Sequence, residues 1–268
     1  MKKSITSMIV YLLVIVFSFA FFTNQLLAQK NFEGYLEQTT IRKSTMPMQP
    51  PKVTENEKIF YKAGKFKTIN LTTGKDVILR FDKELMWTVD NKNKSYTEMT
   101  FAQMQESMDK MKSVMKDQMK DMSPEQRQAM EKMMGKNLGK MFGGDESSFD
   151  ITVKRTGKNK TILGYNCEQI FLNLNNEPMM EMWVTDKLSM GTDWLEVYQK
   201  MGLMKGNLSD EAKKINGIPL ANKMTIDMGM GKMESETEVT KVVKTSVSDS
   251  EFEVPKGYVK KNLGMQFK

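Results

Sequence analysis

The sequence predicts an α+β fold in which an antiparallel β-sheet carries one methionine-rich helical insert. Segments of alternating apolar and polar residues, typical of half-buried strands, occur before residue 100 and again after residue 150. Between them, over residues 101–142, the apolar residues have the spacing of an amphipathic helix. Cys167 is the only cysteine, so an internal disulfide is excluded and the fold must depend on a hydrophobic core.

The first 28 residues have the order of a secretory signal peptide. Lys2 and Lys3 precede an apolar run over residues 9–22, and Ala28 is the expected last residue removed. The run of about 14 residues is shorter than the ~20 that span a bilayer, although an uncleaved anchor is the alternative. We expect a cleaved signal peptide over 1–28, a periplasmic or secreted protein, and one domain over 29–268.

The charge distribution argues against a nucleic-acid partner. Loss of Lys2 and Lys3 would lower the formal net charge from +7 to +5, and the remaining basic residues are spread along the chain without a compact block. An association of the exported protein with the envelope stays open.

Residues 31–100 are expected to form strands joined by tight turns. The hairpin between LMWTVD and SYTEM has its turn at residues 91–94, and residues 46–52 form a proline-rich loop. Two segments, TTGK at residues 72–75 and TGKNKT at residues 156–161, lack the spacing of a phosphate-binding loop and are predicted as hairpin turns.

The insert begins with a helix-capping pattern. Thr100 and Gln103 form a capping box, and a second helix is expected to start at Ser123 with proline at its first helical position. Six methionines in the first helix fall within an arc of about 80°. They are Met104, Met108, Met111, Met115, Met119 and Met122.

Strands are expected again from residue 149 onward. The segments are FDITVKRTG, KTILGYNCEQIFLNL, EPMMEMWVTD, IPLANKMTIDMG and KMESETEVTKVVKTSV. Short helices are predicted at DWLEVYQKM and NLSDEAKK. Glu234, Glu236 and Glu238 alternate, as acids on a solvated sheet face do.

Three segments resemble known families. The hairpin LRFDKELMWTVDNKNKSYTEM is similar to a strand pair of periplasmic outer-membrane lipoprotein carrier (LolA-like) proteins, and SDSEFEVPKGYV is similar to the last strand of that fold. Together with TGKNKTILGYNCEQI, these segments resemble an exported family, domain of unknown function 4412. The resemblance implies a half-barrel, a curved antiparallel sheet around helices that fill an apolar cavity for acyl chains.

The residue types argue against an enzyme. The chain has no histidine, which excludes a Ser-His-Asp or Cys-His arrangement and histidine-bound zinc. Cys167 lies in a predicted strand, where a buried structural thiol is expected rather than a nucleophile. We expect no cofactor.

The methionine stripe is open to three interpretations. It packs a core, or it forms an adaptable face for an apolar ligand, because methionine repacks around varied partners. Alternatively its thioethers bind copper(I) or silver(I), with Met108, Met111 and Met115 as the ligands. A separate methionine group comprises Met228, Met230 and Met233.

The leading hypothesis is an exported, non-enzymatic protein that binds a hydrophobic ligand between sheet and helix. The ligand would be an acyl chain or a lipidated partner, and the six methionines would form its hydrophobic face. The alternatives are a periplasmic copper(I)- or silver(I)-binding protein and a structural envelope-associated protein without a small ligand.

Overall fold

The computed structural model describes residues 31–47, 49–120, 122, 123, 125, 150–189, 208–215, 217–227 and 231–262. These residues form one open sheet of 12 strands, in the order β12-β6-β5-β4-β3-β2-β1-β11-β10-β9-β8-β7. All neighbouring strands are antiparallel except β12, which pairs parallel with β6. The described part of the chain is therefore mostly β, with few helices.

The strands and helices have the following bounds. The first half contains β1 (Gly34–Ser44), β2 (Lys52–Lys62), β3 (Lys65–Asn70), β4 (Lys75–Arg80), the 3-10 helix η1 (Phe81–Lys83), β5 (Leu85–Asp90), β6 (Ser95–Thr100) and α2 (Phe101–Lys120). The second half contains β7 (Ile151–Ile162), β8 (Tyr165–Leu174), β9 (Glu177–Thr185), α6 (Leu208–Ala212), β10 (Ile218–Asp227), β11 (Lys232–Lys244), the 3-10 helix η3 (Asp249–Phe252) and β12 (Val259–Lys260).

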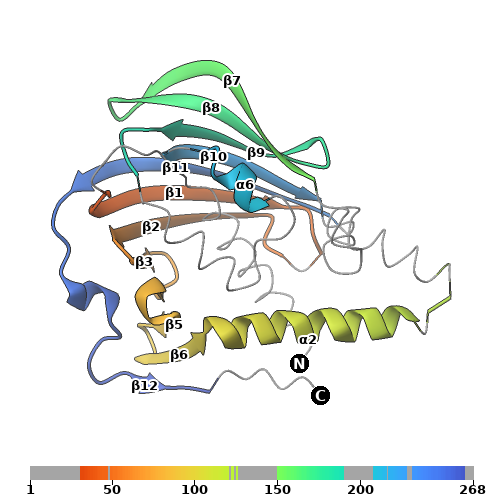
Figure 1. The fold of residues 1–268 in the computed structure, drawn as a ribbon. Coiled ribbons are helices and arrows are strands. Elements are labelled where there is room, and N and C mark those ends of the chain that lie inside the picture. The colour runs from red at the N-terminus through yellow and green to blue at the C-terminus, as the bar shows by residue number, and fades with distance from the viewer. Residues whose placement is uncertain are drawn as a thin grey trace.

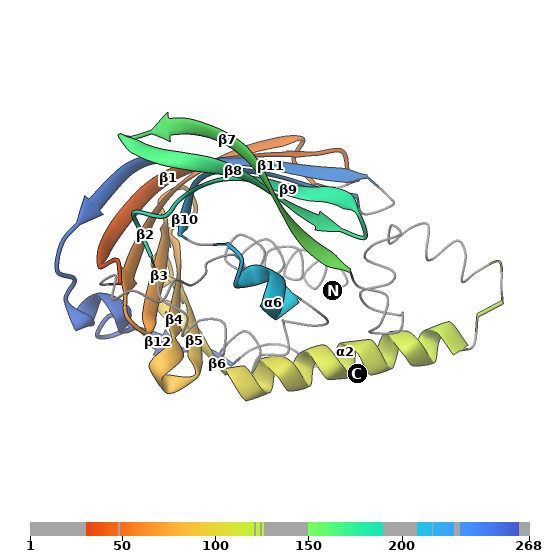
Figure 2. The same ribbon diagram turned by 45° about the horizontal axis from the view of Figure 1, so that its top comes forward.

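The sheet is bent into an arch (Figure 1). Figure 2 shows α6 under the arch and α2 running across its open side, away from the end of β6. Both helices therefore face the concave surface, as a curved sheet with a helical insert requires. The part of the predicted insert beyond α2 lies almost entirely outside the described residues, as do the signal peptide and DWLEVYQKM.

Local sequence patterns predicted several elements correctly. The hairpin between β5 and β6 pairs Leu85 with Thr100 and Asp90 with Ser95, and TTGK joins β3 to β4. The NLSDEAKK turn is the helix α6. Each of these elements depends on contacts between residues close in sequence.

The prediction for TGKNKT was wrong. This segment lies inside β7, where Gly157 has a φ of +72° and the pairing with β8 shifts register between Arg155 and Asn159. It is a β-bulge, which also uses the left-handed backbone that glycine adopts easily. The hairpin turn lies instead at Leu163 and Gly164, with φ values of 49° and 81°.

The convex face of β2 to β5 is covered by residues 245–258, here called the C-terminal strap. Phe252, at 0% exposure, and Val247 are buried against Ile78, Trp87 and Val89 of the sheet. Burial of these apolar side chains stabilises the contact by about 1.5–3 kcal/mol for each large residue.

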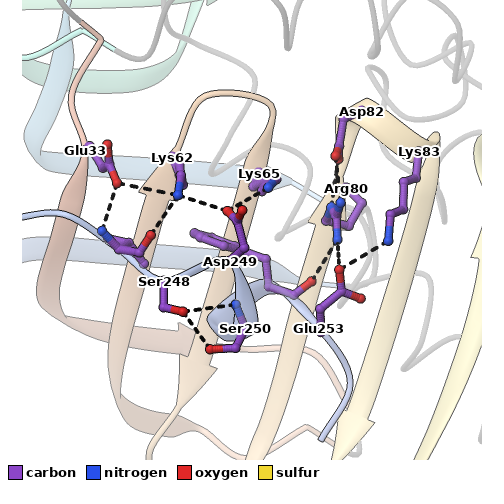
Figure 3. A network of polar contacts seen from close by, with 12 residues as sticks. Glu33, Lys62, Lys65, Arg80, Asp82, Lys83, Ser248, Asp249, Ser250 and Glu253 are labelled. Carbon is purple, nitrogen blue, oxygen red and sulfur yellow. Dashed lines mark hydrogen bonds and ion pairs between the residues drawn. The ribbon is translucent and has the colours of Figure 1, made fainter.

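Polar contacts hold the strap at several points along its length (Figure 3). Asp249 Oδ1 accepts from Lys65 Nζ at 2.8 Å and lies 2.9 Å from Lys62 Nζ. Further along, Glu253 of the strap contacts Arg80 of β4 and accepts from Lys83 Nζ of η1 at 3.2 Å, and Arg80 itself also donates to Asp82 at 2.6 Å. The strap is thus attached to three consecutive strands and the loop that follows them.

The expectation that SDSEFEVPKGYV forms a last strand was wrong for most of its length. Ser248 accepts from Ser250 N and caps η3, and Pro255 has no backbone N–H to donate. Only Val259 and Lys260 pair with the sheet, alongside Ser95 and Tyr96 of β6.

Candidate functional site on the concave face

The helix α2 starts at the predicted capping box. Thr100 N donates to Gln103 Oε1 at 2.9 Å, and Gln103 N donates to Thr100 Oγ1 at 3.1 Å. This reciprocal pair satisfies backbone donors at the helix start and fixes the direction in which α2 leaves β6.

The first turn of α2 is part of the core. Phe101 and Met104 are buried, with Met104 only 2% exposed, and both belong to one cluster with Phe66, Leu79 and Met99. Leu79 and Phe66 point to the face opposite the C-terminal strap, so this cluster lies on the concave side. Met104 therefore joins the helix to the concave face.

The later methionines of the stripe are described unequally. Met108 and Met122 are half-buried, whereas Val114 is 45% exposed and Asp117 is also exposed. The side chains of Met111, Met115 and Met119 lie outside the described residues. Two of the three sulfurs in the metal interpretation are consequently not placed.

The second methionine group is also divided. Met228 and Met230 lie outside the described residues, and Met233 is buried on β11. No group of three or more histidine, cysteine, aspartate or glutamate side chains positioned for a metal occurs among the described residues.

Apolar side chains cover much of the concave face in two clusters. The first cluster contains Leu36, Ile59 and Phe66 from β1 to β3 together with the start of α2. The second cluster joins β7 to β10 and includes Ile170, Leu172, Met180, Met182 and Met224. Cys167 is buried at 0% exposure in the first cluster, which confirms the prediction of a buried thiol.

The apolar face changes to a polar one along β1 and β2. Register pairs Leu36 with Ile59, then Gln38 with Glu57, and then Thr40 with Glu55. Because side chains at every second position share a face, these polar residues point to the same side as the first apolar cluster. We call this set the concave polar strip: Gln38, Thr40, Arg42, Glu55, Glu57, Asn70, Ser235 and Thr237.

Hydrogen bonds and one ion pair connect the strip. Glu55, at 0% exposure, lies 2.5 Å from Arg42 Nη2 and accepts from Asn70 Nδ2 at 3.1 Å. Gln38 Nε2 donates to Glu57 Oε2 at 2.8 Å. The Thr40 and Thr237 hydroxyl oxygens are 3.0 Å apart, which links β1 to β11.

The strip holds two carboxylates and one guanidinium. Burial raises the pKa of Glu57, and the nearby Glu55 carboxylate raises it further, against the opposing effects of Gln38 and Arg42. A charged group in this environment is costly unless it has an opposite charge or hydrogen-bond donors.

Sequence reasoning missed this strip. The available signal was the alternation itself, since Gln38, Thr40 and Arg42 continue the core-facing positions of Leu36. In contrast, the acids Glu234, Glu236 and Glu238 do lie on the solvated face as predicted, and Glu236 pairs with Lys223 at 2.8 Å.

The described helices include none with the length and apolar character needed to cross a membrane.

The model of the family described as a domain of unknown function (DUF4412) matches residues 109–258, which is more than half of the chain. The chain belongs to this family. The match runs from α2 through β7 to β11 and the C-terminal strap, and it confirms the resemblance to DUF4412 stated from the sequence.

Several solved structures are similar in fold to this DUF4412 protein. An uncharacterized conserved protein from Thermus thermophilus has 7% identity and a TM-score of 0.41, with 85% of this chain and 91% of that chain covered. A LolA superfamily protein from Nitrosomonas europaea has 8% identity and a TM-score of 0.31, with 83% and 92% covered. A putative outer membrane lipoprotein-sorting protein domain from Vibrio parahaemolyticus has 10% identity and a TM-score of 0.29, with 81% and 88% covered. No curated protein matches the chain.

Proposed function

We propose that this DUF4412 protein is an exported, non-enzymatic protein that binds a hydrophobic ligand on its concave face. The ligand is an acyl chain, free or attached to a lipidated partner, held between the sheet and the methionine-bearing face of α2. The proposed place of action is the periplasm or the extracellular side, reached through the signal peptide over residues 1–28.

The observation that carries this proposal is the difference between the two faces of the sheet. On the convex face of β2 to β5, the chain covers its own apolar side chains with the C-terminal strap. On the concave face, α2 contributes Phe101 and Met104 from its first turn, while Val114 further along is exposed. The first turn of α2 thus fixes the helix to the concave face, and methionine suits a face that must repack around an apolar guest.

Native mass spectrometry with lipid extraction tests the proposal. The exported protein is purified from cells without detergent, and its retained apolar molecules are extracted and identified. Met108→Lys would place a charge on the half-buried side of α2 and should weaken binding of a fluorescent fatty-acid probe by about tenfold or more. Ser113→Lys, an exposed position on the same helix, is the matched control.

Retained lipid together with selective weakening in Met108→Lys supports the proposal. A protein that neither retains nor takes up apolar molecules would remove it, and a pull-down from envelope extracts would then test the structural, envelope-associated alternative.

The copper(I) and silver(I) interpretation stays a prediction from the sequence. It is tested by copper(I) titration against a competing chelator, before and after Met108, Met111 and Met115 are changed to leucine. Equal affinity in the two proteins would reject this triplet as the metal site.

A further inference from the structure

The turn between β7 and β8 carries a bulky apolar residue in a left-handed backbone. Leu163 has a φ of 49°, which bulky side chains rarely adopt, and its side chain is 46% exposed. The next hairpin turn, between β8 and β9, has the same backbone and uses Asn175 and Asn176, with φ values of 51° and 66°. Asparagine tolerates this conformation better. Leucine at residue 163 therefore costs strain that asparagine would avoid, without burying its side chain fully.

Lysines and aromatic rings surround this turn. Tyr165 pairs with Ile162 across the turn, and the Nζ of Lys244 lies 5.8 Å from the centre of the Tyr165 ring. The turn lies at the same end of the sheet as the end of β11 (Figure 1). The Nζ of Lys160 lies 4.3 Å from the centre of the Trp183 ring. We call this set the β7–β8 tip: Lys158, Lys160, Leu163, Tyr165, Trp183 and Lys244.

The three lysines of the tip are exposed, and within the described part of the chain none of them pairs with a carboxylate. Glu181 is near Trp183, but it accepts from the Trp183 indole at 3.2 Å and from Gln169 at 2.7 Å. Other acids at this end of the sheet have basic partners of their own: Glu33 with Lys62, Glu168 with Arg155, and Asp186 with Lys187. The tip therefore has a net positive charge.

This combination of side chains suits the surface of a lipid bilayer. An exposed leucine can enter the boundary between head groups and acyl chains, and half-buried tyrosine and tryptophan rings prefer the level of the head groups. Lysine ammonium groups on long stems reach the lipid phosphates. An acidic protein surface would attract the lysines, but it would offer nothing to a leucine held in a strained backbone.

We propose that the β7–β8 tip docks the protein on an anionic lipid surface. Leu163 enters the acyl boundary, while Lys158, Lys160 and Lys244 contact the head-group phosphates. The inference goes beyond the hydrophobic-ligand function and does not depend on it, because it requires only the exposed side chains of the tip.

Co-sedimentation with lipid vesicles tests the proposal. One set of vesicles contains phosphatidylglycerol and phosphatidylcholine in equal parts, and the other contains phosphatidylcholine alone. The wild-type protein should bind the anionic vesicles about tenfold more tightly than the neutral ones. Added salt should weaken this binding, because it screens the attraction between the lysines and the lipid charge.

Leu163→Asn removes the apolar contact with a residue that suits the turn. It should weaken binding to anionic vesicles about tenfold, while the midpoint of thermal unfolding stays the same or rises. Leu71→Asn is the matched control, because Leu71 is 62% exposed in the turn between β3 and β4. The control should keep the wild-type affinity for vesicles.

The lysines are tested by combining Lys158→Gln with Lys160→Gln. This variant should bind anionic vesicles about tenfold more weakly at low salt and should lose most of the salt dependence.

Several outcomes would overturn the inference. They are failure of the wild-type protein to bind anionic vesicles, equal affinity for the two kinds of vesicle, and equal losses in Leu163→Asn and Leu71→Asn. Binding of polyglutamate without binding of vesicles would assign the lysines to an acidic protein and overturn it too. The affinity for the fluorescent fatty-acid probe, measured in parallel, decides separately on the proposed function.

Discussion

The two faces of the sheet around β2 to β4 differ in how their side chains are covered and paired. On the convex face, buried apolar side chains meet the C-terminal strap, and the acidic partners of the ion pairs reach solvent, with Glu253 44% exposed. On the concave face, the Arg42–Glu55 pair is buried, and a second carboxylate lies beside it. The strap thus covers apolar side chains on the convex face, whereas the concave face carries a buried ion pair beside a second carboxylate.

The largest expected effect comes from removing the apolar anchor of the strap. Phe252→Ala leaves a void against Ile78 and Val89 and should lower the free energy of unfolding by about 3–5 kcal/mol. Urea titration measures this loss in the free energy of unfolding. Leu71→Ala, at a turn residue 62% exposed, should cost less than about 0.5 kcal/mol. Similar losses in the two variants would mean that the strap does not stabilise the convex face.

The next effect compares one arginine from each face. Arg42→Met leaves the Glu55 carboxylate buried without its cation and should lower the free energy of unfolding by about 3 kcal/mol. Arg80→Met leaves Asp82 and Glu253, which solvent can reach, and should cost about 1 kcal/mol.

A further variant separates lost charge from lost packing. Combining Arg42→Met with Glu55→Leu should restore most of the stability, because no unpaired charge remains buried. If Arg80→Met lowers the free energy of unfolding more than Arg42→Met does, the buried ion pair on the concave face is not the more sensitive of the two, which contradicts this comparison.

The smallest effects are opposite responses to pH. Lys65 and Lys62 lower the pKa of Asp249 from 3.8 to about 2, so its contribution to stability is present above about pH 4 and is lost as the pH falls towards 2. Burial raises the pKa of Glu57 above 4.5, so its carboxylate destabilises the fold increasingly as the pH rises above 4.5 through the raised value.

Unfolding curves of two variants between pH 2 and 8 test this contrast. Asp249→Asn should lose less stability than the wild type when the pH falls from 4 to 2. Glu57→Gln should gain stability relative to the wild type at pH 7 and show little difference at pH 4. The same pH dependence in both variants would contradict the opposite environments of the two carboxyl groups.

How much the sequence predicts depends on the distance between partners along the chain. The capping box at Thr100 and the turn between β5 and β6 are local, and their residue types determine them. The concave polar strip depends on the pairing of β1 with β11, in which Thr40 meets a residue 197 positions later. The alternation after Leu36 indicates which side chains of β1 share a face, but it does not say which distant strand they meet.

Glycine shows a different limit of sequence reasoning. Gly157 and Gly164 both have positive φ, yet one makes a bulge within β7 and the other a hairpin turn. The residue type predicts the backbone conformation in both cases. Only the register of the partner strand decides whether the chain continues or reverses.

Photo-crosslinking with a diazirine-bearing fatty chain tests the central claim most directly. After irradiation and proteolysis, label should appear on Met108 of α2 and on half-buried concave-face residues such as Val77 and Met86, and it should be displaced by unlabelled ligand. Label confined to convex-face residues such as Phe60 and Val254, or the absence of any displaceable label, would contradict binding on the concave face.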